Sequence, residues 1–392
     1  MTKLIDITGK ALSGEWGSDD ETGDGIPVLR TTNFTNEGVV NYNDVVTRII
    51  TKKNIDNKFL RKGDIIIEKS GGSDKFPVGR VIYFNGDENT YLFNNFTGLL
   101  RVKNQEQWFP KYVFYSLFAN YKRGGTRIYE NKTTGLHNLK TDDYVSRYEV
   151  VDMNKKQQVL ICEKLDKLCE IIKLRKKELQ LLDDLIKARF VELFGDPVLN
   201  PHEWAKPELS DLADLKIGPF GSLLHKEDYI EGGHPLVNPS HIVDGRITID
   251  PKLTVSDEKY EELSAYQLKV GDVVMGRRGE MGRCAVVEEE GLLCGTGSLL
   301  IRPKGKVTAD YIQKIISYPT FKKTIEDMAV GQTMPNLNVP IVSGFRIISP
   351  PIEVQNSYYD FIAQVNKSKV AVQKSLDETQ LLFDSLMQKY FG

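Results

Sequence analysis

The stretch Leu60-Arg-Lys-Gly-Asp-Ile-Ile66 decides the fold, because the chain contains a second version of it. The counterpart, Leu268-Lys-Val-Gly-Asp-Val-Val274, follows 208 residues later. A second pair of segments, Gly25-Ile-Pro-Val-Leu29 and Gly233-His-Pro-Leu-Val237, has the same offset, so the spacing between the two motifs is identical in both copies. Such self-similarity indicates a tandem repeat. Two further pairs follow in the same order at offsets of 198 and 197, namely Asn138-Leu139 with Asn336-Leu337 and Tyr148–Val151 with Phe345–Ile348.

Each copy ends in a long helical pattern. The segment from Met153 to Phe194 contains no proline or glycine, and Gly195 and Pro197 then end it. An apolar heptad repeat runs through this segment and, at an offset of 197, through residues 352–392. A helix of about 40 residues is ~60 Å long, and its apolar seam needs a partner. We therefore expect the two helices to form an antiparallel coiled coil that acts as a spacer, with the seam residues Leu165, Leu168, Ile172, Leu179, Leu182, Ile186, Ile362, Val365, Val372, Leu376, Phe383 and Leu386.

The alternative for these helices is that each folds back on its own globular unit as an ordinary amphipathic helix. The first helix also carries a second apolar stripe, away from the seam. A wide apolar face of this kind predicts that another protein, or a neighbouring domain, docks there. The residues of this stripe are Ile171, Leu174, Leu181 and Leu185.

The remaining segments predict two globular units of the α+β class. Short β-rich runs such as Val45–Ile50 and Arg80–Phe84 indicate a twisted sheet of mixed or antiparallel strands. Helical stretches are expected near residues 111–121 and 309–327. The predicted organisation is therefore a globular unit at 1–152, a spacer helix at 153–195, a second globular unit at 196–351 and a C-terminal spacer helix at 352–392, with a pseudo-two-fold relation between the halves.

Composition and charge bound the possible functions. The chain has 392 residues, of which 40% are apolar and 27% charged, as in ordinary globular proteins of two or three domains. Its net charge of −2 provides no global basic field, so nucleic acid could be bound only through local patches. No apolar run reaches the ~18 residues of a membrane span, and the first residues lack a signal-peptide core, which predicts a cytoplasmic protein.

Several kinds of chemistry are missing from the sequence. It contains no GxxxxGK[ST] phosphate loop, no complete dinucleotide fingerprint and no HExxH motif. The four cysteines and five histidines show no metal-ligand spacing, and no nucleophile–base constellation stands out. We therefore expect a chain that is not an enzyme and holds no metal, cofactor or disulfide.

Cationic, glycine-rich turns follow the Gly-Asp strand in both copies. They run from Lys69 to Arg80 in the first copy and from Gly276 to Arg283 in the second. Glycine lets the backbone approach a phosphate closely, and arginine can bind guanine through two hydrogen bonds. A basic, aromatic-bearing loop at residues 121–132 could also reach phosphates and base edges. The alternative is that both turns are solvated hairpins with ordinary surface charge.

In the order and duplication of these motifs, the chain resembles the specificity (S) subunit of Type I restriction-modification systems. The resemblance includes Gln158 and Gln355 near the start of the long helices and Phe194-Gly-Asp-Pro197 between the copies. It implies that each unit is a target recognition domain that reads one half of a bipartite DNA site. It also implies that the coiled coil sets the gap and binds two methyltransferase (M) subunits. The S-adenosylmethionine, ATP and Mg²⁺ chemistry would belong to those partners and to restriction (R) subunits.

The same resemblance places both turns, the basic loop and the segments Thr133–Asn138 and Gln332–Asn336 against double-stranded DNA. Two other functions remain open from the residues: a recognition subunit of a Type II-like restriction-methylation enzyme, and a coiled-coil scaffold whose units do not bind DNA. The predicted DNA-binding residues are Lys69, Ser70, Lys75, Arg80, Lys122, Arg123, Arg127, Tyr129, Lys132, His137, Asn138, Arg277, Arg278, Arg283, Gln332 and Asn336.

Overall fold

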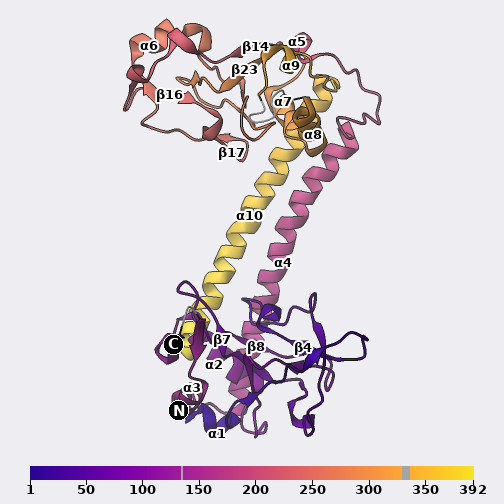
Figure 1. The fold of residues 1–392 in the computed structure, drawn as a ribbon, viewed down its shortest axis with the longest axis vertical. Coiled ribbons are helices and arrows are strands. Elements are labelled where there is room, and N and C mark those ends of the chain that lie inside the picture. The colour runs from indigo at the N-terminus through magenta and orange to yellow at the C-terminus, as the bar shows by residue number, and fades with distance from the viewer. Residues whose placement is uncertain (134–135, 329–335) are drawn as a thin grey trace. The chain divides into compact units, whose positions relative to one another are not determined.

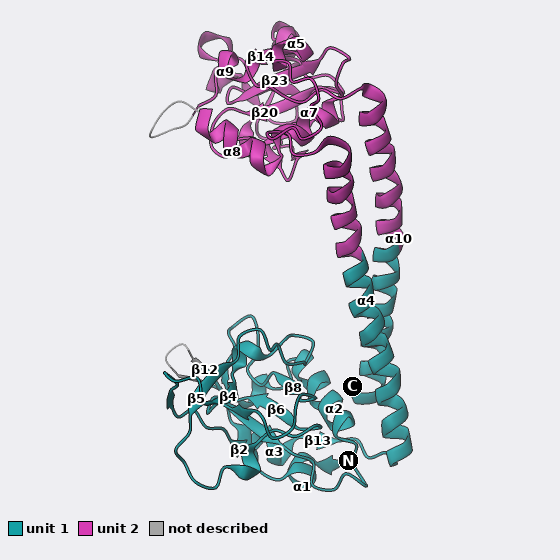
Figure 2. Ribbon diagram, turned by 90° about the vertical axis from the view of Figure 1, so that its right-hand side faces the viewer, with its two compact units in different colours: residues 1–178, 372–392 teal, residues 179–371 magenta. Residues whose placement is uncertain are grey.

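The computed structural model describes residues 1–133, 136–328 and 336–392 and divides them into two compact units (Figure 2). Unit 1 consists of Met1–Glu178 together with Val372–Gly392, and unit 2 consists of Leu179–Ala371. Each unit contains a globular part and a portion of both long helices, so each is described separately.

The two long helices are α4, Lys155–Phe194, and α10, Ile352–Phe391 (Figure 1). In unit 2 they run antiparallel. Lys369 binds Asp183 near one end of the paired segment, while Tyr358 packs against Phe190 at the other. Residues later in α4 therefore contact residues earlier in α10, which is the expected antiparallel pairing.

The predicted seam residues lie on faces of the two helices that are shielded from solvent. In unit 1, Leu165 and Ile172 of α4 are buried, as are Leu376 and Phe383 of α10. All twelve predicted seam residues are buried or half-buried. Their burial is what apolar side chains at the a and d positions of a heptad require, and the seam itself stays a prediction.

The globular part of unit 1 combines small sheets with short helices, as expected for the α+β class. Its helices are α1 (Leu4–Thr8), α2 (Pro110–Lys122) and α3 (Thr141–Arg147). Its strands are β1 (Thr2–Lys3), β2 (Leu12–Ser13), β3 (Ser18–Asp19), β4 (Ile26–Leu29), β5 (Val46–Ile49), β6 (Ile65–Glu68), β7 (Ser70–Gly71), β8 (Val81–Tyr83), β9 (Leu92–Phe93), β10 (Thr97–Leu100), β11 (Glu130–Thr133), β12 (Leu136–Leu139) and β13 (Glu149–Val150).

The globular part of unit 2 has a corresponding set of elements. Its helices are α5 (Leu209–Leu212), α6 (Asp257–Glu262), α7 (Ala309–Ile316), α8 (Pro319–Met328) and α9 (Val339–Ser343). Its strands are β14 (Ala213–Ile217), β15 (Tyr229–Ile230), β16 (His234–Val237), β17 (Ile242–Val243), β18 (Arg246–Ile247), β19 (Thr254–Val255), β20 (Val273–Gly276), β21 (Cys284–Val286), β22 (Leu293–Cys294) and β23 (Ser298–Pro303).

The sheet topology is the same at the centre of both units. An antiparallel sheet has the order β2-β10-β6-β8 in unit 1 and β14-β23-β20-β21 in unit 2. Beside it, one pair of strands is parallel, β4 with β9 and β16 with β22. The helical stretch expected at 309–327 is divided into α7 and α8, because Pro319 disfavours helical geometry at Tyr318.

The Gly-Asp motif has a structural role in both units. Gly63 has a φ of 94°, a backbone conformation that would be strained in a residue with a side chain. The carboxylate of Asp64 accepts two hydrogen bonds from Arg101, at 2.7 and 2.6 Å. In unit 2, Gly271 has a φ of 86°, and Arg302 donates to Asp272 at 2.8 and 2.7 Å in the same way. Both carboxylates are buried and paired, so the motif fixes the start of the strand that leads to each cationic turn.

Gln158 and Gln355 join each long helix to its globular part. The side-chain oxygen of Gln158 accepts from the Phe109 N–H at 2.7 Å, at the start of α2, and that of Gln355 accepts from the Thr308 N–H at 3.0 Å, at the start of α7. The side-chain nitrogen of Gln158 donates to the Met153 carbonyl, and that of Gln355 donates to the Pro350 carbonyl. The repeat is therefore preserved at the level of individual hydrogen bonds.

Candidate nucleic-acid interface

In unit 1, the cationic turn lies beside the Asn-Leu segment. Strand β7 pairs antiparallel with β12, which places His137 opposite Gly71 and Asn138 opposite Ser70. The Leu139 N–H also donates to the Lys69 carbonyl at 2.8 Å. Two segments separated by almost 70 residues, both predicted to face DNA, are thus side by side.

Unit 2 repeats this arrangement with its own residues. Arg278 forms an antiparallel bridge with Asn336, and the Leu337 N–H donates to the Arg277 carbonyl at 3.0 Å. Arg277 and Leu337 correspond in the repeat to Lys69 and Leu139. Of the other predicted residues, Gln332 lies outside the described residues, and the side chain of Lys132 is not described either.

Only part of the basic loop of unit 1, residues 121–132, contacts the cationic turn. Arg127 donates to the carbonyls of Asp74 and Lys75 at 3.2 and 3.3 Å, so the loop holds the turn in place. Lys75 itself is exposed, and the ring of Tyr129 packs against that of Tyr144.

Lys122 and Arg123 lie elsewhere in unit 1. They line a hollow of about 1200 Å³ between α2 and the long helices, where Lys122 lies over the ring of Phe118. Burial lowers the pKa of Lys122 from its ordinary value. The structure therefore does not bring these two cations together with Arg127 at the turn.

Two of the predicted contact residues in unit 1 are held by its own side chains. His137 is buried, and its Nδ1 lies 3.2 Å from Glu130 Oε2. Lys69 donates to Ser13 Oγ at 3.0 Å, and burial, assisted by Lys58, lowers the pKa of its ammonium group.

The equivalent arginines Arg80 and Arg283 each immediately precede the strand that leaves the turn, β8 and β21 respectively. Arg80 donates to the carbonyls of Thr31 and Phe34, both at 2.9 Å, and its Nη2 lies 3.4 Å from the buried Glu68. Arg283 donates to the Pro239 carbonyl, the counterpart of Thr31, at 3.2 Å. Arg80 thus points inward, whereas Arg283 also reaches an exposed acid on its own turn, Glu280, at 2.7 Å.

Arg277 and Arg278 place two positive charges next to each other on the turn of unit 2. Arg278 is exposed and Arg277 half-buried. Burial lowers the pKa of the Arg277 guanidinium, and the neighbouring Arg278 charge lowers it further. Among the described residues, Arg277 Nε has no hydrogen-bond partner. An anion at this turn would relieve the repulsion between the two cations.

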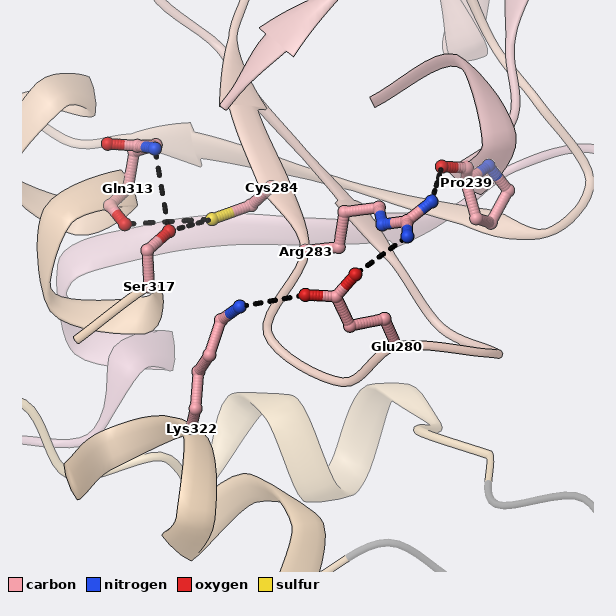
Figure 3. A network of polar contacts seen from close by, with 7 residues as sticks. All are labelled: Pro239, Glu280, Arg283, Cys284, Gln313, Ser317 and Lys322. Carbon is pink, nitrogen blue, oxygen red and sulfur yellow. Dashed lines mark hydrogen bonds and ion pairs between the residues drawn. The ribbon is translucent and has the colours of Figure 1, made fainter. Parts of the chain in front are cut away.

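The structure adds Lys322, which sequence reasoning missed. It comes from α8 and donates to Glu280 at 3.0 Å, so that Glu280 joins Lys322 and Arg283 in one polar network (Figure 3). No sequence signal identifies Lys322, because only the packing of α8 against the turn brings it there.

The second apolar stripe of α4 is exposed, as the heptad analysis predicts. Ile171 and Leu174 are 41% and 57% exposed in unit 1, and Leu181 and Leu185 are 56% and 46% exposed in unit 2.

The parts of the chain that the structure describes contain no group of His, Cys, Asp and Glu side chains suited to holding a metal ion. Within the same residues, no helix has both the length and the apolar character to cross a membrane.

Comparisons with known proteins give a consistent result. Residues 3–183 and 201–379 each match the sequence model of a family described as Type I restriction modification DNA specificity domain. A putative type I restriction enzyme specificity subunit, MjaX, from Methanocaldococcus jannaschii is 26% identical over 200 residues, which are 49% of this chain and 46% of the relative. The match thus spans about half the length of that relative.

Solved structures share the fold over the whole chain. The S subunit of the Type I restriction-modification system from M. genitalium superposes with a TM-score of 0.53, and the HsdS subunit from Thermoanaerobacter tengcongensis with 0.54. A chain from a study of complex assembly and conformational transition in the type I R-M system gives 0.63. Each is 16% identical, and the alignments cover 100% of this chain and 95%, 95% and 96% of those chains.

Proposed function

The chain belongs to the Type I restriction modification DNA specificity domain family, and on this premise we propose that it is the non-catalytic specificity subunit of a Type I restriction-modification complex. The observation that carries the proposal is the paired turn. In both units, a cationic turn lies against an Asn-Leu segment at equivalent positions. Two similar surfaces in one chain are what a reader of a bipartite DNA site requires.

Each unit would read one half of the site. The turn of unit 2 offers Arg277 and Arg278, which could bind phosphate or guanine, and the turn of unit 1 offers Lys69 and Lys75. Because the residues at the two turns differ, the two half-sites should differ in sequence. With a net charge of −2, the chain alone should bind DNA weakly, since affinity depends on the number of phosphates neutralised.

The long helices would set the gap between the half-sites and bind the methyltransferase subunits. Support for docking comes from the exposed stripe of Ile171, Leu174, Leu181 and Leu185, because large apolar side chains on a helix surface commonly mark a protein interface. S-adenosylmethionine, ATP and Mg²⁺ would be bound by the methyltransferase and restriction partners.

The experiment is a methylome comparison in a host that expresses the chain with its partner subunits. Wild type should methylate a bipartite sequence. The R277A/R278A double variant should relax recognition of one half-site, and the matched double variant K69A/K75A should relax only the other. Equal loss at both halves would contradict modular reading, and absence of any methylated motif from an assembled complex would contradict the function.

A further inference from the structure

Glu280 lies between two cations that come from different parts of unit 2 (Figure 3). Its Oε2 accepts from Arg283 Nη2 at 2.7 Å, and its Oε1 accepts from Lys322 Nζ at 3.0 Å. Because both cations donate to it, Arg283 first and Lys322 second, the pKa of the Glu280 carboxyl lies below its ordinary value. One exposed carboxylate on the turn therefore binds two cations, one from the turn and one from α8.

The two cations are positioned by other contacts as well. Arg283 is fixed by the Pro239 carbonyl at 3.2 Å, and Lys322 is carried by α8. The side chains of Glu280, Arg283 and Lys322 are 54%, 33% and 31% exposed, so solvent reaches all three. They line a hollow of about 360 Å³ together with polar residues such as Gln313 and Ser317. There is room for an anion to approach both cations.

A phosphodiester group resembles a carboxylate in its hydrogen-bond acceptors. It presents two anionic oxygens, each of which accepts charge-assisted hydrogen bonds from lysine or arginine. The place that the Glu280 carboxylate occupies between a guanidinium and an ammonium is therefore suited to a backbone phosphate.

The equivalent position in unit 1 is built differently. There Arg80 reaches Glu68, which lies on the strand and is buried, so that no phosphate could take its place. The residue of unit 2 that corresponds to Glu68 is Gly276, and the acid that binds Arg283 is instead on the exposed turn. Of the two arginines in their described surroundings, Arg283 of unit 2 is therefore the one paired with an acid that DNA could displace.

We propose that Arg283 and Lys322 form a phosphate-binding site and that Glu280 occupies it in the free protein as an internal competitor. The inference rests on the proposed function, since it requires that this face of unit 2 meets DNA. A phosphate must displace the tethered carboxylate before it gains both cations. Glu280 therefore weakens binding to every DNA sequence, and only duplexes that also make base contacts overcome the competition.

The test measures the affinity of the full-length chain for a fluorescein-labelled 30-base-pair duplex of mixed sequence across a salt series. E280Q should bind about 2- to 5-fold more tightly than wild type, the gain expected when weak, solvent-exposed ion pairs no longer have to be broken. The dependence of log affinity on log salt should steepen by about 0.9, because one more phosphate is neutralised. The added substitution K322Q should abolish both changes.

The matched control is E289Q, which removes one negative charge from an exposed residue beyond β21. If E289Q tightens binding as much as E280Q, the gain reflects net charge and the proposed site is wrong. No binding by wild type and E280Q alike at 50 mM salt would also overturn it. Thermal unfolding of each variant shows whether the fold is retained.

A methylome comparison separates this proposal from the proposed function. If wild type methylates a bipartite motif while E280Q binds DNA no more tightly than E289Q, only the competitor role fails. If the assembled wild-type complex methylates no motif, the proposed function fails whatever E280Q does.

Discussion

The ring of Phe391, in the last turn of α10, packs against the ring of Tyr112 on α2, with centroids 5.1 Å apart in unit 1. In unit 2, Phe194, in the last turn of α4, packs against Tyr311 on α7 at the same distance. Phe194 and Phe391 are 197 residues apart, the offset of the repeat. The end of α10 thus packs into the globular part of unit 1, which contains the start of α4. The end of α4 packs in the same way into the globular part of unit 2, which contains the start of α10.

Phe391 should consequently stabilise unit 1. Because its ring is buried against Tyr112, F391A should lower the free energy of unfolding of unit 1 by about 3 kcal/mol. Hydrogen exchange followed by mass spectrometry should show lost protection in α2 with α7 unaffected. L381A, on the same helix but 72% exposed, should cost less than about 0.5 kcal/mol. Equal loss of protection in both units would contradict this role.

Gln158 should be essential for attaching α4 to its globular part. Q158L leaves the Phe109 N–H and the Gln107 and Met153 carbonyls without their partner, which should cost about 3 kcal/mol in urea unfolding. The neighbouring variant Q157L changes an exposed side chain and serves as the control. A similar stability for Q158L and Q157L would show that water replaces these hydrogen bonds.

Glu68 should make stability depend on pH. Burial raises the pKa of its carboxyl above the ordinary value, although Arg80 acts in the opposite direction. The folded state therefore disfavours the ionised form, and this cost is present above the folded pKa and absent below the unfolded pKa of about 4.5.

E68Q removes this cost. It should stabilise the protein by on the order of 1 kcal/mol at pH 8, and its advantage over wild type should shrink as the pH falls towards 4.5. Urea unfolding of both proteins between pH 4.5 and pH 8 measures the difference. A variant that is less stable than wild type at pH 8 would show that the contact with Arg80 outweighs burial.

The cysteines should differ in their reactivity towards alkylating agents. Burial raises the pKa of the Cys162, Cys284 and Cys294 thiols to about 12, so almost no thiolate is present at pH 8. Cys169 is exposed, although burial of its sulfur raises its pKa as well. Iodoacetamide should label Cys169 alone, and slowly, whereas urea-unfolded protein should be labelled at all four. Rapid labelling of Cys284 would contradict the packing of α7 over it.

The sequence predicted the parts of the fold that depend on periodicity and repetition. Heptad spacing was sufficient to predict that the two long helices pair antiparallel, and the repeat offset was sufficient to pair Lys69 with Arg277. Sequence spacing could not predict which way a side chain points around a helix, so Lys122 at the hollow was grouped with Arg127 at the turn. It also could not show that Arg80 turns inward towards Glu68, since that depends on which carbonyls the fold brings within reach.

The packing of Phe391 against Tyr112 also sets an order in which the protein can be completed during synthesis. Residues 372–392 of unit 1 leave the ribosome after all of unit 2, residues 179–371, has been made. At about 5–20 residues per second, the nascent N-terminal half waits roughly 10–40 s with the apolar surface around Tyr112 uncovered. The half that is translated first is therefore the last to close.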